Sequence, residues 1–449
     1  MSLSPIQLKM IHKLLQSGTE TKIAHLVEKI HPSDLTVLFS ELSPQETQRL
    51  VNSLFLVSKA GLTLKELPEF MLPDILELTD DEKLVTIISR LEPDDALYIM
   101  EHIPESRWRA ILDNLPVETR NLLDKLLSYP HNSAGSVMNS NFISVKADMT
   151  AGEAIAYIRN HPETHGVFYV YVTDEGNHLV GVQSLRQLLL APESHKIADI
   201  MTKNVHAVPA SMPEEEVAQE VSRYNLLAIP VVSDTHEMLG VITVDDIIDI
   251  VEEAATEDIY HLAGLSEEDR ASTPLMVKVQ KRTPWMILNL FTAILAASVV
   301  GFYQESIKEV VALAVFMPIV AGMGGNCAAQ SLTVITRSIA LGELSFVKTY
   351  SAIMKEMSNG LLIGVVTGLI AALLGYFWNG NPYLGLVLLV SMILNMAIGG
   401  LMGACVPIAL KALKFDPAVG STVIVTTFTD VCGFLAFLGI ATMMMKYLI

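Results

Sequence analysis

Five long apolar segments in the C-terminal part of the chain constrain its fold most. They cover residues 285–302, 310–339, 361–378, 383–410 and 418–445. Each can cross the ~30 Å hydrocarbon core of a bilayer, which takes about 20 helical residues. Lipid satisfies no backbone hydrogen bonds, so a lipid-exposed segment of this kind must be helical. We therefore expect a bundle of five transmembrane helices within residues 284–449.

Charge is divided unevenly between the two halves of the chain. From residue 283 onward there are six acids and seven bases, a balance of +1, whereas the whole chain carries −19. Subtraction leaves −20 on residues 1–282. A nucleic-acid partner is excluded, because it requires a basic surface. The acidic part is suited instead to binding cations.

The bases that flank the apolar segments predict the orientation in the membrane. Most lie before the first segment, between the second and third, or between the fourth and fifth: Lys278, Lys281, Arg282, Arg337, Lys348, Lys355, Lys411 and Lys414. Positive loops remain on the cytoplasmic side. We expect a multi-pass protein of the cell (inner) membrane, with residues 1–282 in the cytoplasm and the C-terminus outside.

The last apolar segment contains one carboxylate, Asp430, on a polar stripe. Thr422, Thr426, Thr429, Asp430 and Gly433 lie at offsets 0, 4, 7, 8 and 11, which places them on one helical face. A charge at this depth is costly unless it meets water or a partner. The stripe predicts the wall of a cation pathway. The alternative is a polar contact between helices.

The second apolar segment has a glycine- and amide-rich stretch after Pro318. Gly324 and Gly325 leave the backbone open to close approach, and Asn326 and Gln330 lie one turn apart on the same face. Backbone carbonyls freed near a proline must face protein or water inside a bilayer. We expect Gly325, Asn326 and Gln330 to line the pathway, while small residues nearby also permit tight packing.

Residues 1–130 have helical periodicity and an internal repeat. His31-Pro32-Ser33-Asp34 opens one copy and Glu92-Pro93-Asp94-Asp95 opens another. Proline followed by an acid is typical of a helix N-terminus. Repeated helix pairs predict an all-α superhelical docking domain.

Residues 131–200 and 201–255 form a second tandem repeat, in which strands alternate with helices. The first unit contains Gly181-Val182-Gln183-Ser184 and the second Gly240-Val241-Ile242-Thr243. The pair resembles CBS domains, which are regulatory α/β modules. The resemblance implies that Thr243 and Asp246 of the second unit contact the ribose of an adenine nucleotide such as ATP. In the first unit Gln187 stands where the acid would be.

An acidic run opens the segment that connects these repeats to the membrane, for which we expect a connecting helix over residues 256–283. Its seven acids are Asp245, Asp246, Asp249, Glu252, Glu253, Glu257 and Asp258. Like charges at helical spacing repel, and Mg²⁺ or Ca²⁺ would relieve that repulsion. The charge pattern favours a regulatory cation site and a solvated acidic face about equally.

Taken in order, these parts resemble the MgtE family of magnesium channels over nearly the whole chain. The stretch Pro318–Gln330 is similar to the family's second-helix motif, and Thr426-Thr427-Phe428-Thr429-Asp430 is similar to its ion-binding fifth-helix motif. Ala328-Ala329 departs from the small and polar pair expected before Gln330. Residues 129–138 resemble the family's junction into the CBS pair.

The resemblance implies a homodimer that imports Mg²⁺ through a pore on its two-fold axis, where two Asp430 carboxylates face one ion. It also implies closure by cytosolic Mg²⁺ bound between the acidic domains. The matching acids are Asp94, Asp95, Asp246, Asp249, Glu257, Asp258 and Asp416.

Three other functions remain open at the level of the sequence. The chain could transport another divalent ion, such as Co²⁺ or Ca²⁺, or couple magnesium to Na⁺. Oxygen-only residues around Asp430 disfavour a soft metal. A membrane-bound signalling protein would leave Asp430 without a purpose. An enzyme is disfavoured, because the sequence has no nucleophile–base set and no zinc signature.

Overall fold

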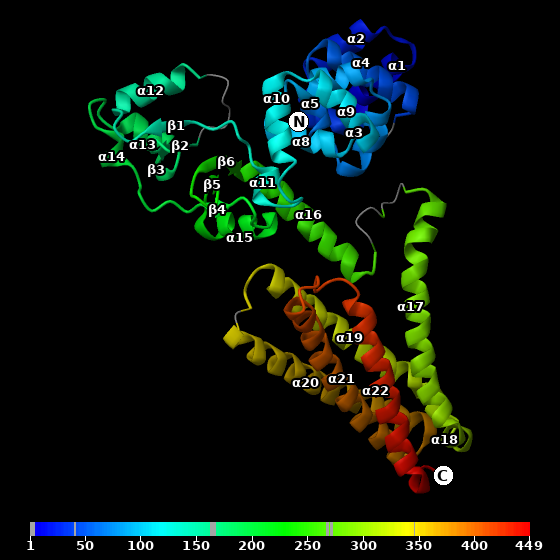
Figure 1. Cartoon of the computed structure of the whole chain (residues 1–449). Helices are drawn as coiled ribbons and strands as arrows, with labels where there is room; N and C mark the ends of the chain where they lie inside the picture. Colours follow the sequence, from blue (N-terminus) through cyan, green and yellow to red (C-terminus); the bar gives the residue numbers. More distant parts are fainter. Residues whose placement is uncertain (1–4, 40–41, 162–167, 266–268, 270–272, 345) are drawn as a thin grey trace. The chain divides into compact units, whose positions relative to one another are not determined.

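The protein is described by a computed structural model that covers all residues except 1–4, 40–41, 162–167, 266–268, 270–272 and 345 (Figure 1). The chain divides into two compact units, Met1–Val251 and Glu252–Ile449. The first unit holds a helical domain and two small sheets. The second is entirely helical over its described residues.

Short helices build the first domain. They are α1 (Pro5–Ser17), α2 (Glu20–Val27), α3 (Pro32–Phe39), α4 (Pro44–Leu56), α5 (Ala60–Leu64), the 3₁₀ turn η1 (Glu69–Met71), α6 (Leu72–Glu77), α7 (Asp81–Ile88), α8 (Pro93–Glu101), α9 (Glu105–Asn114) and α10 (Val117–Leu126). The predicted prolines open α3, α4 and α8. Ser43 caps α4 in a capping box with Glu46. The inward leucines and isoleucines form one continuous core.

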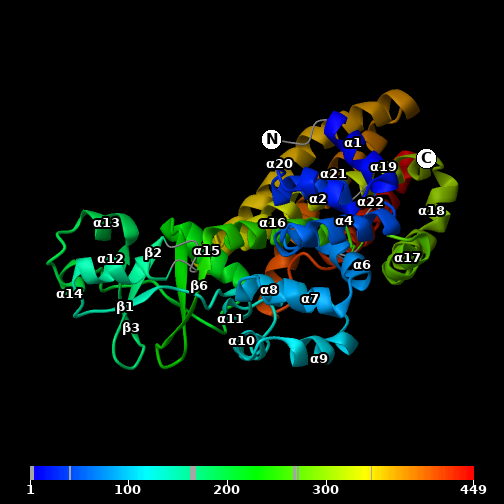
Figure 2. The same cartoon turned by 90° about the horizontal axis from the view of Figure 1, so that it is seen from above.

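Two copies of one α/β unit follow. The first contains α11 (Ala134–Val137), β1 (Ser144–Lys146), α12 (Ala151–Arg159), β2 (Tyr169–Thr173), β3 (Leu179–Ser184) and α13 (Leu185–Leu190). The second contains α14 (Ile197–Ile200), β4 (Val208–Pro209), α15 (Glu214–Tyr224), β5 (Ala228–Val232) and β6 (Met238–Thr243). In each sheet the first strand is parallel and the third antiparallel to the middle one. Figure 2 shows α12, α13 and α14 beside the first sheet and α15 beside the second. Helix α14 opens the second copy in sequence but packs against β3 of the first, and α11 packs against β6 of the second.

One helix, α16 (Val244–Leu262), follows β6 directly and carries the whole acidic run. The helix therefore begins well before residue 256. Of the predicted connecting segment, residues 266–268 and 270–272 lie outside the described part. Residues 275–283 belong to the first membrane helix.

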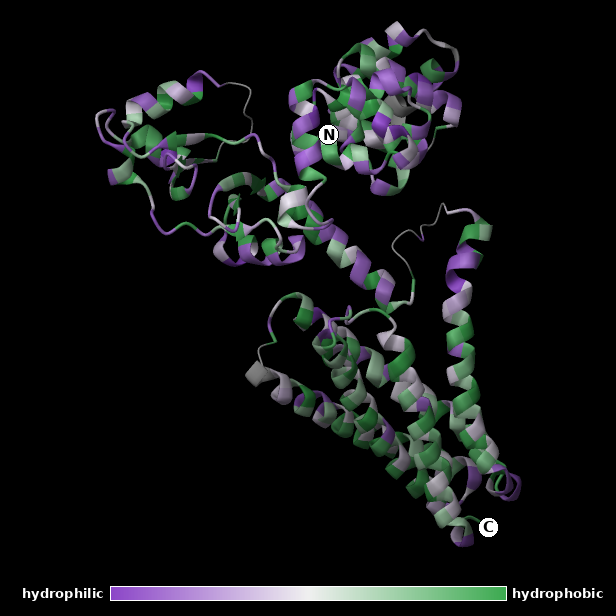
Figure 3. Ribbon diagram, viewed as in Figure 1, coloured by the Kyte–Doolittle hydropathy of each residue, from purple (hydrophilic) through white to green (hydrophobic). Residues whose placement is uncertain are grey.

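Among its described residues, the second unit contains five helices that are long and apolar enough to cross a membrane. These are α17 (Leu275–Phe302), α19 (Ala312–Ala340), α20 (Phe346–Asn379, with its apolar span from Thr349), α21 (Pro382–Ala412) and α22 (Ser421–Met443). Short helices α18 (Gln304–Glu309) and α23 (Met445–Leu448) complete the unit. Figure 3 shows apolar residues along these helices and a mixed surface on the first unit. The five predicted spans are thus confirmed as helices of spanning length.

Helix α21 is the centre of this unit and packs against α19, α20 and α22. Its glycines allow close approach: a Cβ on Gly399 would lie 2.8 Å from the Gly324 carbonyl oxygen, and one on Gly403 would lie 2.8 Å from the Ser331 Cβ. The amphipathic pattern of residues 341–358 predicts a segment that lies along the inner membrane surface. In the structure, residues 346–358 of this segment continue into the third span as one helix, α20.

Candidate ion pathway and cation-sensing sites

The polar residues of α19 lie on its open side. Asn326 and Gln330 are exposed, and Gly325 is partly exposed, whereas Gly324 is buried. Helix periodicity explains the division, because positions 326 and 330 are one turn apart and 324 faces elsewhere. The three predicted pathway residues of α19 are therefore accessible within this chain.

On α22 the predicted polar stripe divides into two rows. Thr422, Thr426 and Asp430 are partly exposed and lie at successive intervals of four. Thr429 and Gly433 are buried inside the bundle instead. Within this chain these two residues contribute to contacts between helices, and their place on the pathway wall stays a prediction. Gly433 faces Asn395 of α21, and Thr429 faces Gly325 of α19.

Helices α19 and α22 lie close together beside Asp430. A Cβ on Gly325 would lie 3.9 Å from the Thr429 hydroxyl oxygen. Thr429 donates this hydroxyl to the Thr426 carbonyl at 3.0 Å, so it needs no partner on α19. The glycine- and amide-rich stretch is thus adjacent to the turn of α22 that carries the acid.

Asn395 of α21 holds this part of the bundle together. Its Nδ2 donates to the Val320 carbonyl of α19 at 2.8 Å, which agrees with its predicted role as a partner between helices. The side chain is fully buried, and its Oδ1 has no hydrogen-bond partner among the described residues. It fills the space left by Gly324 on one side and Gly433 on the other.

A second acid within the candidate spans, Glu356 of α20, was not predicted as a functional residue. Ser331 of α19 donates its hydroxyl to Glu356 Oε2 at 2.7 Å. In the sequence Glu356 follows Lys355 and precedes the apolar segment 361–378, so it gave no signal of an acid within a membrane helix. Its partner is 25 residues away in the chain, which periodicity cannot identify.

In the first unit the structure brings Asp94 of α8 and Asp246 of α16 within electrostatic reach of each other. Burial, followed by the charges of Asp246 and Asp95, raises the pKa of Asp94 well above its usual range. Burial also raises the pKa of Asp246 to about 6, although the Thr243 hydroxyl opposes the shift. Asp94 Oδ1 is buried without a hydrogen-bond partner among the described residues. A bound cation would relieve both carboxylates.

Some carboxylates near Asp94 and Asp246 already have protein partners, which limits the oxygens that an ion could use. Asp95 is paired with Lys65, whose Nζ lies 2.7 Å from Asp95 Oδ2. Asn139 donates its side-chain amide to Glu92. The predicted residues Asp94, Asp95 and Asp246 are therefore together, but Asp95 already has a cationic partner.

The expected nucleotide residues cap α16. Thr243 donates its hydroxyl to Asp246 Oδ2 at 2.7 Å, and its backbone N–H donates to the same oxygen at 3.1 Å. In the first copy of the repeat, the Ser184 hydroxyl donates to Gln187 Oε1 at 3.1 Å. The two copies thus share one local geometry, with an acid in the second copy and a neutral amide in the first.

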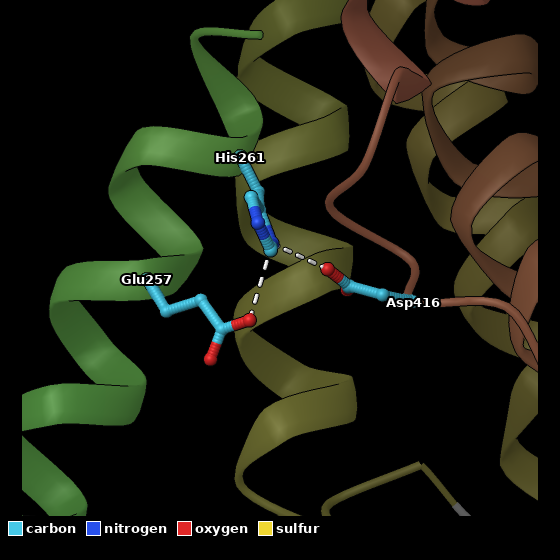
Figure 4. Close-up of side chains that lie close together, drawn as sticks. All are labelled: Glu257, His261 and Asp416. Atoms are coloured by element: carbon cyan, nitrogen blue, oxygen red, sulfur yellow. Dashed lines mark hydrogen bonds and ion pairs between the residues drawn. The ribbon is translucent and has the colours of Figure 1, made fainter. Parts of the chain in front are cut away.

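In the second unit the end of α16 meets the loop between α21 and α22. His261 Nδ1 lies 2.7 Å from Asp416 Oδ2 and 3.6 Å from Glu257 Oε1 (Figure 4). Asp258 lies on the next position of the helix, and burial, then the Asp416 charge, raises its pKa while Arg337 and His261 oppose the shift. Asp249 is exposed near the start of the helix.

Three of the predicted sensing acids, Glu257, Asp258 and Asp416, thus lie close together, and His261 lies among them without having been predicted. It lies four residues after Glu257, which is a signal that the sequence did contain. Its contact with Asp416 spans 155 residues and could not be read from the chain.

Three families match successive parts of the chain. Residues 30–132 match the MgtE intracellular N domain, residues 134–193 and 197–253 match the CBS domain, and residues 317–440 match the family described as a divalent cation transporter. These matches cover the helical domain, the two α/β units and four of the five long apolar helices.

Relatives of known name match over almost the full length. A Bacillus subtilis protein named magnesium transporter MgtE is 31% identical over 430 residues, which are 96% of this chain and 95% of the relative. A Thermus thermophilus protein of the same name is 31% identical over 97% of this chain and 98% of its own. An Enterococcus faecalis protein of that name is 36% identical over 73% of this chain and 72% of its own.

Solved structures match the first unit. The soluble part of a magnesium transporter superposes with a TM-score of 0.51 and 28% identity, covering 56% of this chain and 98% of that structure. The cytosolic domain of the Mg²⁺ channel MgtE in complex with ATP gives the same score and identity over 54% of this chain and 99% of that one. With full-length relatives and all three family matches in the expected order, the chain belongs to the MgtE family of magnesium transporters.

Proposed function

We propose that this protein imports Mg²⁺ into the cell through a pore formed by a homodimer, and that cytosolic Mg²⁺ closes the pore. The observation that carries the proposal is the position of Asp430. It is the only carboxylate of α22 and is partly exposed. The preceding residue, Thr429, lies beside Gly325 of α19, and Asn326 and Gln330 of that helix are exposed. A partly exposed acid at this depth requires water, an ion or a partner.

The donor set favours a hydrated Mg²⁺ ion as cargo. Mg²⁺ loses water reluctantly and prefers octahedral oxygen coordination. Carboxylate, amide and hydroxyl oxygens can hold such an ion through its waters, and weak outer contacts also allow its release. In a two-fold dimer the same wall would occur twice, with two Asp430 side chains facing one ion. The oxygen donors disfavour a soft metal as cargo, and competition with Co²⁺ and Ca²⁺ tests the ranking.

The closing mechanism rests on two groups of acids. In the absence of a cation, Asp94 and Asp246 repel each other, as do Asp258 and Asp416. Mg²⁺ bound by each group would join the surfaces that carry these acids and favour one of two states. Asp249, Glu257 and Asp95 would complete the sensing sites. The basic flanks support a cytoplasmic position for residues 1–282, where they would sense internal Mg²⁺, and a C-terminus outside.

An adenine nucleotide would bind the second α/β unit through Thr243 and Asp246. The likeness of the first unit to a cytosolic domain crystallised with ATP supports this proposal. The acid in the second copy, against Gln187 in the first, makes the second copy the better ribose site. Calorimetric titration of residues 1–251 with ATP tests it, and no heat at millimolar nucleotide would contradict it.

Replacement of the pore acid tests the transport proposal directly. Asp430→Asn keeps the side-chain volume and removes two charges per dimer, so Mg²⁺ uptake into liposomes should fall by at least tenfold. Glu309→Gln, at the end of the short helix α18, is the control and should transport normally. Wild-type uptake by the Asp430→Asn protein, with an unchanged Mg²⁺ preference over Co²⁺ and Ca²⁺, would remove the proposed pathway.

A further inference from the structure

The side chains of Glu257, His261 and Asp416 form a cluster that mixes nitrogen and oxygen donors. The donor atoms of the three residues all lie within 4.8 Å of one another. Figure 4 shows the imidazole of His261 between the two carboxylates. The cluster is also accessible, because the side chains of His261, Glu257 and Asp416 are 18%, 34% and 37% exposed. An ion from the cytoplasm can reach it.

The local structure holds the donors in place before any ion binds. Glu257 and His261 are one helical turn apart on α16, so their side chains lie on the same face. The Ala418 backbone N–H donates to Asp416 Oδ1 at 2.8 Å, which leaves Oδ2 directed at the imidazole. Thr422 donates its hydroxyl to the Leu262 carbonyl at 2.5 Å and ties the end of α16 to the start of α22.

The donor set differs from the sites expected for magnesium. Mg²⁺ prefers oxygen ligands and retains several waters. Imidazole nitrogen is a preferred ligand of zinc, nickel, copper and iron, and affinity among the divalent ions generally rises from manganese toward copper. Three protein ligands also leave coordination positions for water, as in many zinc and cobalt sites. His261 therefore changes which ion this cluster selects.

We propose that Glu257, His261 and Asp416 form a regulatory site for a first-row transition-metal dication, and that an ion bound there joins α16 to the α21–α22 loop. This inference rests on the proposed function, because the ion would favour the closed state of the same pore. It adds a second class of signal. Mg²⁺ would still close the pore through the Asp94 and Asp246 group. At Glu257 and Asp416 the added imidazole would let a transition metal, at lower concentration, bind in place of Mg²⁺ and close the same pore.

The visible absorption of bound Co²⁺ measures metal binding at this site independently of transport. The full-length protein in detergent is titrated with Co²⁺ in the presence of millimolar Mg²⁺, which occupies the Mg²⁺ sites. The visible absorption bands of bound Co²⁺ are recorded. Wild type should show bands that saturate, and His261→Gln should weaken Co²⁺ binding by at least tenfold. His178→Gln is the matched control. Its imidazole also pairs with a carboxylate four residues away, Asp174, at 3.0 Å.

A third variant separates the donor type from general damage to the site. His261→Asp makes the donor set all oxygen, so it should keep metal binding but lose the preference for Co²⁺ over Mg²⁺. Equal Co²⁺ affinity in wild type and His261→Gln, or displacement of Co²⁺ by an equal concentration of Mg²⁺, would overturn the proposal. The cluster would then be an imidazole–carboxylate ion pair only.

Transport provides the second readout. Mg²⁺ flux through the full-length protein in liposomes is measured while Co²⁺ is raised on the cytoplasmic side. Closure by Co²⁺ should require at least tenfold more metal in His261→Gln, while closure by Mg²⁺ stays within about twofold of wild type. Block of the pore itself by Co²⁺ would be the same in both proteins. Absence of any Mg²⁺ flux in wild type would contradict the transport proposal, whereas the absorption result would still decide the metal site.

Discussion

At the scale of single residues, Asn395 shows how a polar side chain organises an apolar bundle. Its amide reaches the Val320 carbonyl, and two glycines on different helices leave room for it. A hydrogen bond of this kind between membrane helices is worth about 1 kcal/mol. Its larger effect is steric, because no side chain at Gly324 or Gly433 fits beside it. The two helices proposed to line the pore are thereby held at a fixed separation.

Alanine at Gly433 should therefore destabilise the protein. The added Cβ would lie 2.6 Å from Asn395 Nδ2, so we expect a loss of about 1–3 kcal/mol and reduced Mg²⁺ flux. Gly439→Ala on the same helix is the control, because its Cβ would meet only the Tyr303 hydroxyl at 3.4 Å. Thermal unfolding of both variants in detergent measures the difference. Equal midpoints would show that the bundle adjusts freely around Asn395.

The raised pKa values of Asp94 and Asp246 predict how the stability of the first unit depends on pH. A carboxyl whose folded pKa exceeds the unfolded value of 3.8 keeps its proton longer when folded. The stabilisation that these two carboxyls contribute is complete below pH 3.8. For Asp246 it is lost as pH rises through about 6, and Asp94 contributes a loss of the same sign. For Asp246 alone the loss amounts to at most ~3 kcal/mol. In EDTA, residues 1–251 should unfold more easily at pH 7.5 than at pH 5.

Magnesium should remove most of this dependence, because a cation stabilises the ionised pair. Asp94→Asn should also flatten it. Asp174→Asn is the control. Backbone N–H groups and His178 lower the pKa of that exposed carboxyl, so its contribution to stability changes with pH in the opposite direction. Chemical denaturation at the two pH values, with and without Mg²⁺, provides the comparison. An Asp94→Asn protein with the wild-type pH dependence would contradict the assignment.

At the scale of elements, sequence pattern predicted the helices and strands well, since local rules determine them. Pro32 and Pro93, each followed by an acid, predicted the starts of α3 and α8, and the two α/β repeats followed from alternating segments. Pairing across long separations was not predictable. His261 with Asp416 and Ser331 with Glu356 depend on how helices pack, and the division of the Thr422–Gly433 stripe depends on which neighbours each face meets.

Helix α16 is the element in which charge should control closure. Neutralising Asp246, Asp249, Glu257 and Asp258 together should leave the pore open at high cytosolic Mg²⁺, because neutral side chains cannot bridge surfaces through an ion. The control neutralises four exposed acids of the α/β units: Glu175, Glu193, Asp199 and Asp234. The effect is measured as Mg²⁺ flux at increasing cytosolic Mg²⁺ concentrations and as the protection of the protein from protease by Mg²⁺. Normal closure of the α16 variant would identify the acidic run as a solvated face.

At the scale of the whole molecule, α17 shows that the chain leaves a long apolar surface for other partners. Met286, Leu290 and Phe291 are each more than half exposed, and few residues of this helix are buried within the chain. Lipid or a second copy of the protein must cover them. The proposed homodimer would use part of this surface and would bring two copies of α19 and α22 to one axis.

Mixed dimers test whether both chains act on one ion. Equal amounts of wild-type and Asp430→Asn chains, assembled at random, give about a quarter wild-type dimers. Flux near one quarter of wild type is expected if two carboxylates are required together, and flux near one half would indicate two independent pathways. If the two chains carry different tags, two successive affinity steps isolate the mixed dimer, whose flux can then be measured separately.

The space around Asn395 also has an evolutionary consequence. Gly324, Gly433 and Asn395 belong to three different helices, yet they fill one shared volume. A larger residue can become fixed at either glycine position only after position 395 has become smaller. The three positions should accordingly change as a set among descendants of a common ancestor. Lineages that have lost the asparagine should be those in which alanine or serine has replaced a glycine on α19 or α22.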